Sequence, residues 1–313
     1  MIEFKIKEGV KDFVAINLGN YFIKGVIIKD NKISDYFIEK RTDLTSLIKK
    51  IWQEKKIQID KVKLSIKDLN CLVRIFPFIK LERKKLKEAL TYELSKHIPF
   101  SPEEIYFDFF ILNEINQNEV NLLLAVSKKD IIDKILEVFE DQKLRVLSIT
   151  LDGISLINLF LDRYKEDRNS NVSILDIGHS LSTLILLEKG IPFILREITF
   201  GTKDIINILL NLKDISDIDK WLFELKDYEE FFKVSSDILF NLCREIRTSF
   251  DYFELKKAKP IEKLYITGGI ANILYKSKFF ENTFNLNIDV LNKNSTVPDL
   301  FKEAFSVVSG LIL

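Results

Sequence analysis

The sequence has little of several residue types that mark particular classes of protein. Its 313 residues include only two cysteines, Cys71 and Cys243, which lie far apart and outside any Cys-x-x-Cys context. This favours two buried, reduced thiols in a cytoplasmic protein over a disulfide framework. With only two histidines and no HExxH, GxSxG or Walker GxxxxGK[ST] motif, the sequence does not indicate the hydrolases and NTPases that depend on them.

Net charge and long apolar runs are also lacking. The 47 Lys and Arg residues balance 47 Asp and Glu residues, which argues against a protein that binds nucleic acid through bulk positive charge. No apolar run reaches the ~18 residues that a spanning helix needs, and the charged N-terminus has no signal-peptide core. We therefore expect a cytoplasmic protein of about two domains that binds no nucleic acid and does not insert directly into a membrane.

Glycine is scarce, with ten residues, and half of these follow predicted strands. A glycine at the end of a strand either closes a tight turn or lets the backbone approach a ligand closely. For any single glycine both readings stay open, but the joint pattern favours a nucleotide cleft. The five are Gly19, Gly178, Gly201, Gly268 and Gly269.

Residues 172–190 contain the most informative of these turns. A buried strand over 173–175 leads into a turn with Asp176 and Gly178, and an apolar strand follows over 181–187. Such a turn can hold phosphate through its backbone N–H groups and the hydroxyls of Ser182 and Thr183, while the carboxylate holds a metal ion. A plain hairpin turn is the alternative.

A second copy of the pattern strengthens the first interpretation. Residues 13–30 again read as strand, polar residue, x-Gly turn and strand, with Asn17 in the position of Asp176 and Gly19 in that of Gly178. Two such hairpins about half a chain apart predict two similar α/β domains that face each other across a cleft.

Residues 75–148 are expected to form a compact insert in the first domain. An apolar run over 75–81 is interrupted by Pro77, and a helix is predicted over 83–97, followed by strands over 105–112 and 120–126. A second amphipathic helix is predicted over 128–139. The last predicted helix, over 298–312, is expected to pack in the core rather than to anchor the chain in a membrane.

The glycine hairpins and the segment LYITGGIANI resemble the actin, Hsp70 and sugar-kinase superfamily. Within it, KEALTYELSKHIPFSPEEIYFDFFIL (87–112), LDIGHSLSTLILLEKG and FNLCREIRTSFDYF resemble successive blocks of the PilM family of type IV pilus assembly proteins. The resemblance implies a two-domain actin-like ATPase fold with duplicated ribonuclease-H-like domains and an FtsA-type insert. The implied parts are a first domain (1–74 and 149–171), the insert (75–148), a second domain (172–200 and 261–313) and a helical subdomain (201–260).

The same resemblance implies a site for ATP and Mg²⁺. Asp176 would hold the metal, with Asn17 acting through a water, and Asp176 is also the candidate for catalysis. Gly201 would lie near the ribose, and Gly268, Gly269 and Ile270 would line the adenine. Asp217 and Lys220 would contact the nucleoside, unless they form an ordinary surface pair. The first phosphate loop would contribute Asn17, Gly19, Asn20, Tyr21 and Lys24, and the second Asp176, Gly178, Ser182 and Thr183.

One departure from the family pattern bears on activity. The family carries an acid where this chain has Asn17, and a neutral amide adds no charge to hold Mg²⁺. The sequence therefore predicts nucleotide binding with weak or absent hydrolysis. His97 and His179 match no motif and are read as structural.

The resemblance also implies a partner, the cytoplasmic N-terminal peptide of a PilN-like inner-membrane protein, together with other pilus platform proteins. The peptide would lie between the first domain and the insert and would hold the chain at the membrane. The aromatic candidates for this groove, which are alternatively core residues, are Phe76, Phe78, Tyr92 and Phe109. Two other functions stay open, a small-molecule kinase and a scaffold without nucleotide.

Overall fold

The first half of the chain builds a five-stranded sheet around the hairpin that carries Asn17. In the computed structural model, which describes residues 10–212, 228–292 and 305–313, β1 and β2 are antiparallel, as are β2 and β3. On the other side of β1, β4 and β8 run parallel to it. The strand order is β3-β2-β1-β4-β8, with bounds Phe13–Leu18 (β1), Phe22–Lys29 (β2), Lys32–Lys40 (β3), Lys61–Ile66 (β4) and Arg145–Leu151 (β8).

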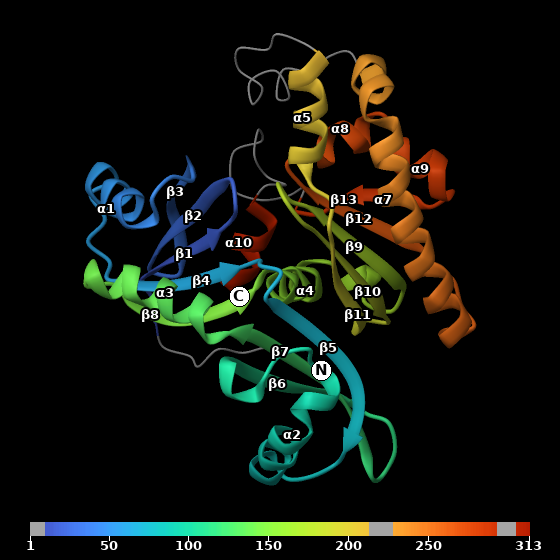
Figure 1. The fold of residues 1–313 in the computed structure, drawn as a ribbon, viewed down its shortest axis with the longest axis horizontal. Helices are drawn as coiled ribbons and strands as arrows, with labels where there is room; N and C mark the ends of the chain where they lie inside the picture. Colours follow the sequence, from blue (N-terminus) through green and yellow to red (C-terminus); the bar gives the residue numbers. More distant parts are fainter. Residues whose placement is uncertain (1–9, 213–227, 293–304) are drawn as a thin grey trace.

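The second half repeats this sheet strand for strand. Its order is β11-β10-β9-β12-β13, with β9, β10 and β11 antiparallel and β12 and β13 parallel to β9. The two sheets lie side by side (Figure 1). The duplicated α/β fold predicted from the two hairpins is therefore confirmed. The bounds are Asn171–Ile177 (β9), Ser182–Glu188 (β10), Ile191–Ile198 (β11), Lys263–Gly268 (β12) and Asn287–Val290 (β13).

Helices cover the outer faces of both sheets. α1 begins after Asp43, whose carboxylate accepts a hydrogen bond of 2.9 Å from the Ser46 backbone N–H, an N-cap that satisfies an otherwise unpaired donor. α1 and α3 pack on the first sheet, and the remaining outer helices belong to the second half. Their bounds are Leu44–Glu54 (α1), Lys129–Asp141 (α3), Thr202–Leu212 (α5), Tyr228–Lys257 (α7), Ala271–Lys276 (α8) and Phe279–Phe284 (α9).

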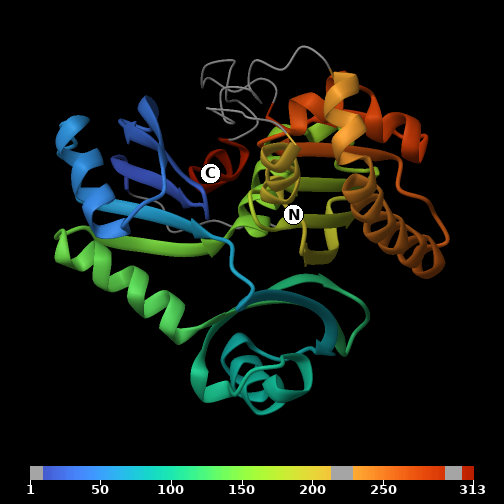
Figure 2. The same cartoon turned by 45° about the horizontal axis from the view of Figure 1, so that its top comes forward.

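Two helices lie between the sheets and join the halves (Figures 1 and 2). α4 (Asp152–Arg163) packs on β9 and β10 of the second sheet, while α10 (Ser306–Leu311) packs on β1 and β2 of the first. All six residues of α10 are buried, as expected of a core helix. The rest of the helix predicted over 298–312 lies partly outside the described residues. None of the helices that the structure describes has the length and apolarity to cross a bilayer.

The insert is a three-stranded sheet, ordered β5-β7-β6, with α2 on one face. Leu86, Leu90 and Leu94 of α2 are buried against the sheet, and the opposite face packs on α4 and β11. Pro77 does not break β5, because within the described part of the chain β5 pairs only with β7, and an edge strand tolerates the missing N–H. The bounds are Cys71–Ile79 (β5), Arg83–His97 (α2), Ile105–Glu114 (β6) and Glu119–Lys128 (β7), with short 3₁₀ helices at Pro102–Glu104 and Lys165–Asp167.

The insert is shorter than the predicted range 75–148. The three-stranded sheet and α2 occupy residues 71–128. α3 belongs to the first sheet instead, because Phe139 is fully buried in that core, and β8 pairs with β4. Periodicity identified α3 as amphipathic but could not say which sheet covers its apolar face.

Candidate functional site

Both glycine turns open toward the same place between the two halves. The parallel strands β1, β4 and β8 end at Leu18, Ile66 and Leu151, and β9 ends at Ile177. Ligands of α/β proteins bind outside the carboxyl ends of such strands. Tyr21 of the first turn stacks on His179 of the second, with ring centroids 4.2 Å apart. The two turns therefore face each other, as the paired hairpins predicted.

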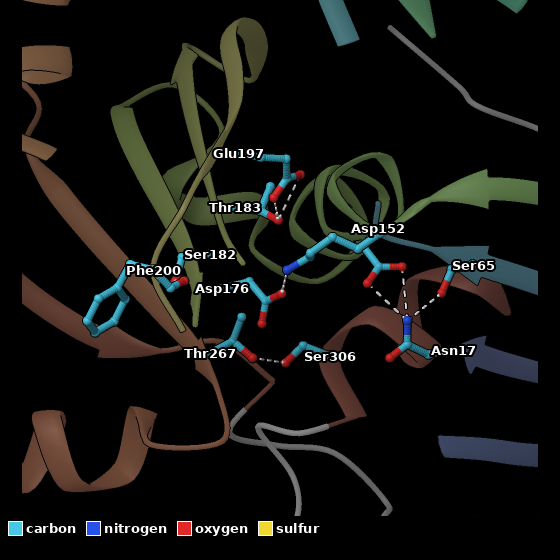
Figure 3. A network of polar contacts seen from close by, with 11 residues as sticks. Asn17, Ser65, Asp152, Asp176, Ser182, Thr183, Glu197, Phe200, Thr267 and Ser306 are labelled. Atoms are coloured by element: carbon cyan, nitrogen blue, oxygen red, sulfur yellow. Dashed lines mark hydrogen bonds and ion pairs between the residues drawn. The ribbon is translucent and has the colours of Figure 1, made fainter. Parts of the chain in front are cut away.

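A buried cluster of charged and polar groups lies between these turns (Figure 3). Lys67, just after β4, forms an ion pair with Asp176 of β9, and both side chains are about nine-tenths buried. The Asn17 amide donates to both carboxylate oxygens of Asp152, at 2.9 and 3.0 Å, and to the Ser65 hydroxyl at 2.9 Å. The first half thus contributes Lys67, the Asn17 amide and the Asp152 carboxylate, and the second half contributes the Asp176 carboxylate.

The cluster shifts the pKa values of its members. Burial lowers the pKa of Lys24, although the carboxylates of Asp176 and Asp152 oppose that effect. Burial also acts to lower the pKa of Lys67, but the surrounding carboxylates, Asp176 foremost, raise it on balance. Burial raises the pKa of Asp152. The carboxylates thus favour the charged forms of both lysines, and a charged amino group can pair with a phosphate.

The second phosphate turn differs in one respect from the sequence prediction. Ser182 and Thr183 are fully buried, and their hydroxyls already have acceptors within the second half. Ser182 donates to the Phe200 carbonyl at 2.9 Å, and Thr183 donates to the Glu197 carboxylate at 2.9 and 3.1 Å. Both hydroxyls therefore donate within the protein in this structure, and their contact with a phosphate stays a prediction. The Gly178 backbone N–H also donates within the turn, to the Leu181 carbonyl at 3.2 Å, so Asp176 remains the turn's main candidate.

Glu197 is expected to make the stability of the protein depend on pH. Burial raises its pKa from 4.5 to about 7, so the folded state keeps a proton that the unfolded state releases. Its contribution to stability is complete below pH 4.5 and is lost as the pH rises through 7. Glu197→Gln keeps the neutral form, and we expect it to be more stable than the wild type by about 2 kcal/mol at pH 8 and nearly equal at pH 5.

Urea unfolding at both pH values measures this difference. Glu140→Gln, which removes an exposed carboxylate from α3, is the matched control and should change stability equally at the two pH values. Equal stability of Glu197→Gln and the wild type at pH 8 would show that this carboxyl has an ordinary pKa.

The other predicted glycines hold the second half's loops together. A Cβ on Gly201 would lie 2.1 Å from the His179 carbonyl oxygen, because the N-terminus of α5 donates to the second turn through Thr202 and Lys203. Gly268 has φ +101°, and its neighbour Gly269 donates to the Ile177 carbonyl at 3.2 Å. Ile270 is 1% exposed within the core of the second half, so its side chain does not line a surface, and only its backbone could.

The glycine pair provides a matched stability test. A Cβ on Gly268 would lie 2.2 Å from the Ile177 carbonyl oxygen, whereas one on Gly269 would meet nothing closer than 3.8 Å. Gly268 also has a left-handed φ, which residues with a side chain rarely adopt. We therefore expect Gly268→Ala to lower the free energy of unfolding by roughly 3 kcal/mol, and Gly269→Ala by less than about 1 kcal/mol. Denaturant unfolding of both variants checks this, and similar costs would refute it.

The remaining predicted residues are placed as follows. Phe78 and Phe109 are buried under α2, so they support the insert and cannot contact a peptide. Phe76 is stacked on His97, with centroids 3.7 Å apart. Tyr92 is 87% exposed on α2. Asn20 is exposed, and Asp217 and Lys220 lie outside the described residues.

Sequence reasoning missed Ser65, Lys67, Asp152 and Glu197. A signal existed for two of them, since Lys67 follows β4 directly and Asp152 follows β8 directly, and the carboxyl ends of parallel strands meet at one edge. Glu197 had no such signal, because it lies within β11 and reaches the site through Thr183. Together with Asn17, Lys24 and Asp176, these residues give carboxylate oxygens suited to Mg²⁺ beside two lysines suited to phosphate.

Comparison with known proteins identifies the fold. A family model described as type IV pilus assembly protein PilM matches residues 14–298. A solved PilM-PilN type IV pilus biogenesis complex matches with a TM-score of 0.84 at 20% identity, covering 97% of this chain and 98% of that chain. The ethanolamine utilization protein EutJ from Carboxydothermus hydrogenoformans matches with a TM-score of 0.59 at 10% identity, covering 98% and 90%. A protein of unknown function with an actin-like ATPase fold from Bacteroides thetaiotaomicron matches with a TM-score of 0.50 at 12% identity, covering 96% of both chains.

Proposed function

The chain belongs to the PilM family of type IV pilus assembly proteins, and we propose that it is the cytoplasmic, ATP-binding component of a pilus assembly platform. It binds Mg-ATP between its two halves and holds the N-terminal peptide of a PilN-like inner-membrane protein, which keeps it at the membrane. The observation that carries the nucleotide part is the buried cluster of Lys24, Lys67, Asp152 and Asp176 between the two glycine turns.

The residues of the cluster fit such a ligand. A Cβ on Gly19 or Gly178 would lie 2.5 or 2.6 Å from a carbonyl oxygen of its own turn, so these turns admit only glycine. Lys24 and Lys67 would bind the phosphates, and Asp176 and Asp152 would hold Mg²⁺. Bound Mg-ATP supplies the charges that let these residues tie the two halves together. Lys67, now paired with Asp176, would be shared between that carboxylate and a bound phosphate.

The neutral residue at the end of β1 favours binding without rapid turnover. Asn17 places its amide on Asp152 and Ser65 and adds no charge for a metal. We therefore propose that ATP acts as a ligand that sets the angle between the two halves, and not as a source of energy through hydrolysis. Thermal unfolding tests the binding step, since ligand at 100 times its Kd adds about 2.7 kcal/mol to stability.

The rival functions give different results in the same assays. A nucleotide-free scaffold shows no rise in melting temperature with Mg-ATP. A small-molecule kinase consumes ATP only when its substrate is added, which a panel of sugars and small acids reveals. Slow, substrate-independent release of phosphate together with a clear thermal shift supports the proposed role.

The free edge of β6 is the proposed place for the partner peptide. Among the strands that the structure describes, β6 pairs only with β7, and an extended peptide can add to such an edge through main-chain hydrogen bonds. The other edge, β5, contains Pro77, which lacks a backbone donor. Along β6, Tyr106 is 46% exposed and donates to Asp133 of α3 at 3.0 Å, and Ile111 is 42% exposed. This edge therefore lies beside the first half of the chain.

A peptide titration tests this placement. The first ~20 residues of a PilN-like protein, labelled with a fluorophore, are expected to bind at micromolar Kd, near −8 kcal/mol. The double variant Tyr106→Ala with Ile111→Asp should weaken binding at least tenfold. Tyr92→Ala is the matched control, because Tyr92 is an exposed tyrosine of the same insert on the outer face of α2. Weakening by Tyr92→Ala alone would place the peptide on α2, and no binding at all would remove the partner claim.

A further inference from the structure

A pair of stacked rings joins the tips of the two glycine turns. Tyr21 of the first turn and His179 of the second have ring centroids 4.2 Å apart and ring planes 19° apart. Lys40 Nζ lies 4.6 Å from the centroid of the Tyr21 ring, within the range of a cation–π contact. Both rings are partly buried. The stack therefore ties the first half of the molecule to the second at the place where the turns face each other.

The backbone behind each ring is held within its own half. The Tyr21 carbonyl accepts a hydrogen bond of 2.7 Å from the Arg41 backbone N–H. The His179 carbonyl accepts one of 2.9 Å from the Lys203 N–H, and the Thr202 hydroxyl lies 3.4 Å from Nδ1 of the His179 ring. Each ring thus moves with its own half, and a rotation of one half relative to the other would separate the two rings.

The two halves do not need this stack in order to stay joined. The helices α4 and α10 already connect them through residues that are buried between the two sheets. The stack lies instead within the two turns, three residues from Lys24 on one side and from Asp176 on the other. It therefore stands at the place where the phosphates of ATP are proposed to bind.

A phosphate cannot lie between the two rings while they are stacked. Carbon atoms in van der Waals contact are about 3.5–4.0 Å apart, so rings with centroids 4.2 Å apart leave no room for a further atom between them. We propose that Tyr21 and His179 form a latch that holds the two turns together before nucleotide binds and that opens when phosphates enter between the turns. The latch regulates the proposed nucleotide site, and it rests on that proposal for its ligand.

The latch is expected to have a moderate effect. A stacked aromatic pair changes an equilibrium constant by roughly two- to tenfold. A latch of this strength lowers the apparent affinity for ATP by a similar factor, because only molecules with separated rings can take phosphates between the turns. Removal of one ring should therefore raise the affinity, whereas removal of a ring that contacts the nucleotide would lower it.

The distance between the halves tests the latch without nucleotide. Spin labels attached to Gln53→Cys of α1 and Glu254→Cys of α7 report this distance by double electron–electron resonance, since both positions are exposed. The two native cysteines, Cys71 and Cys243, are buried, so the labels react at the introduced positions.

Two substitutions of the same residue separate the ring stack from the polar contact. His179→Ala removes the ring and is expected to raise the ratio of open to closed molecules about two- to tenfold. His179→Phe is the matched control, because it also loses the contact with Thr202 but keeps a ring against Tyr21. Its distance distribution should match that of the chain with His179.

Isothermal titration with Mg-ATP completes the test. His179→Ala should bind ATP about two- to tenfold more tightly than the wild type, and His179→Phe should stay within twofold of it. Unchanged distances in His179→Ala, or a weaker affinity of this variant for ATP, would overturn the latch. A wild type that bound no ATP would instead contradict the proposed nucleotide site, and the distances measured without nucleotide would still support or overturn the latch.

Discussion

Gly310→Val is expected to destabilise the protein by more than about 4 kcal/mol, because it forces a branched side chain into the crossing of two buried helices. α10 crosses α4 so closely that a Cβ on Gly310 would lie 1.8 Å from the Ser155 carbonyl oxygen. Both helices are buried between the two sheets, so neither can move aside without opening the joint core. Gly310→Ala should already cost roughly 3 kcal/mol, because even one methyl group overlaps the α4 backbone.

Thermal unfolding of Gly310→Ala and Gly310→Val measures the loss of stability that each substitution causes. For a chain of this size each kcal/mol lowers the melting temperature by roughly 2 °C, so a fall of about 8 °C or failure to fold is expected for Gly310→Val. A melting temperature within 2 °C of the wild type would mean that α10 does not pack on α4. The same result would reopen the possibility that the terminal helix has a role outside the core.

Lys24→Met is expected to lower the affinity for Mg-ATP about 100-fold, equivalent to about 2.7 kcal/mol. Lys24 lies on β2 opposite Asn17, where burial lowers its pKa while Asp176 and Asp152 favour its charged form. A phosphate placed beside it would form a charge-assisted hydrogen bond in a site shielded from water. Methionine keeps the length of the side chain and removes only the charge and the donors.

Isothermal titration of both proteins with Mg-ATP checks this expectation. Lys29→Met is the control, since Lys29 is an exposed lysine at the end of the same strand, and its affinity should stay within twofold of the wild type. If Lys24→Met bound within threefold of the wild type, Lys24 would have no phosphate to contact.

The fold was predictable because its evidence is local and repeated. The hairpins around Asn17 and Asp176 each show an apolar strand, a glycine turn and a second strand, and their duplication predicts the two sheets. The limit appears at α3, whose apolar face was recognised but whose partner sheet was not. Long-range packing decides that question, and a single amphipathic pattern carries no information about it.

The site was only partly predictable for the same reason. Asn17 and Asp176 lie within the repeated motif, whereas Lys67 and Asp152 follow strands of different parts of the chain and meet only in the folded molecule. The directions of the Ser182 and Thr183 hydroxyls could not be predicted either. They depend on Phe200 and Glu197 of β11 and the loop after it, acceptors within the protein that compete with any ligand.

Titration of the wild-type protein with ATP, with Mg²⁺ and then with EDTA, tests most directly whether the charged groups between the two glycine turns form a nucleotide site. The structure predicts saturable binding of one ATP per chain, weakened at least tenfold when Mg²⁺ is removed, since Asp176 and Asp152 then face the phosphates without a cation between them. If isothermal titration calorimetry detected no saturable heat of binding at millimolar ATP, the result would contradict the proposed site.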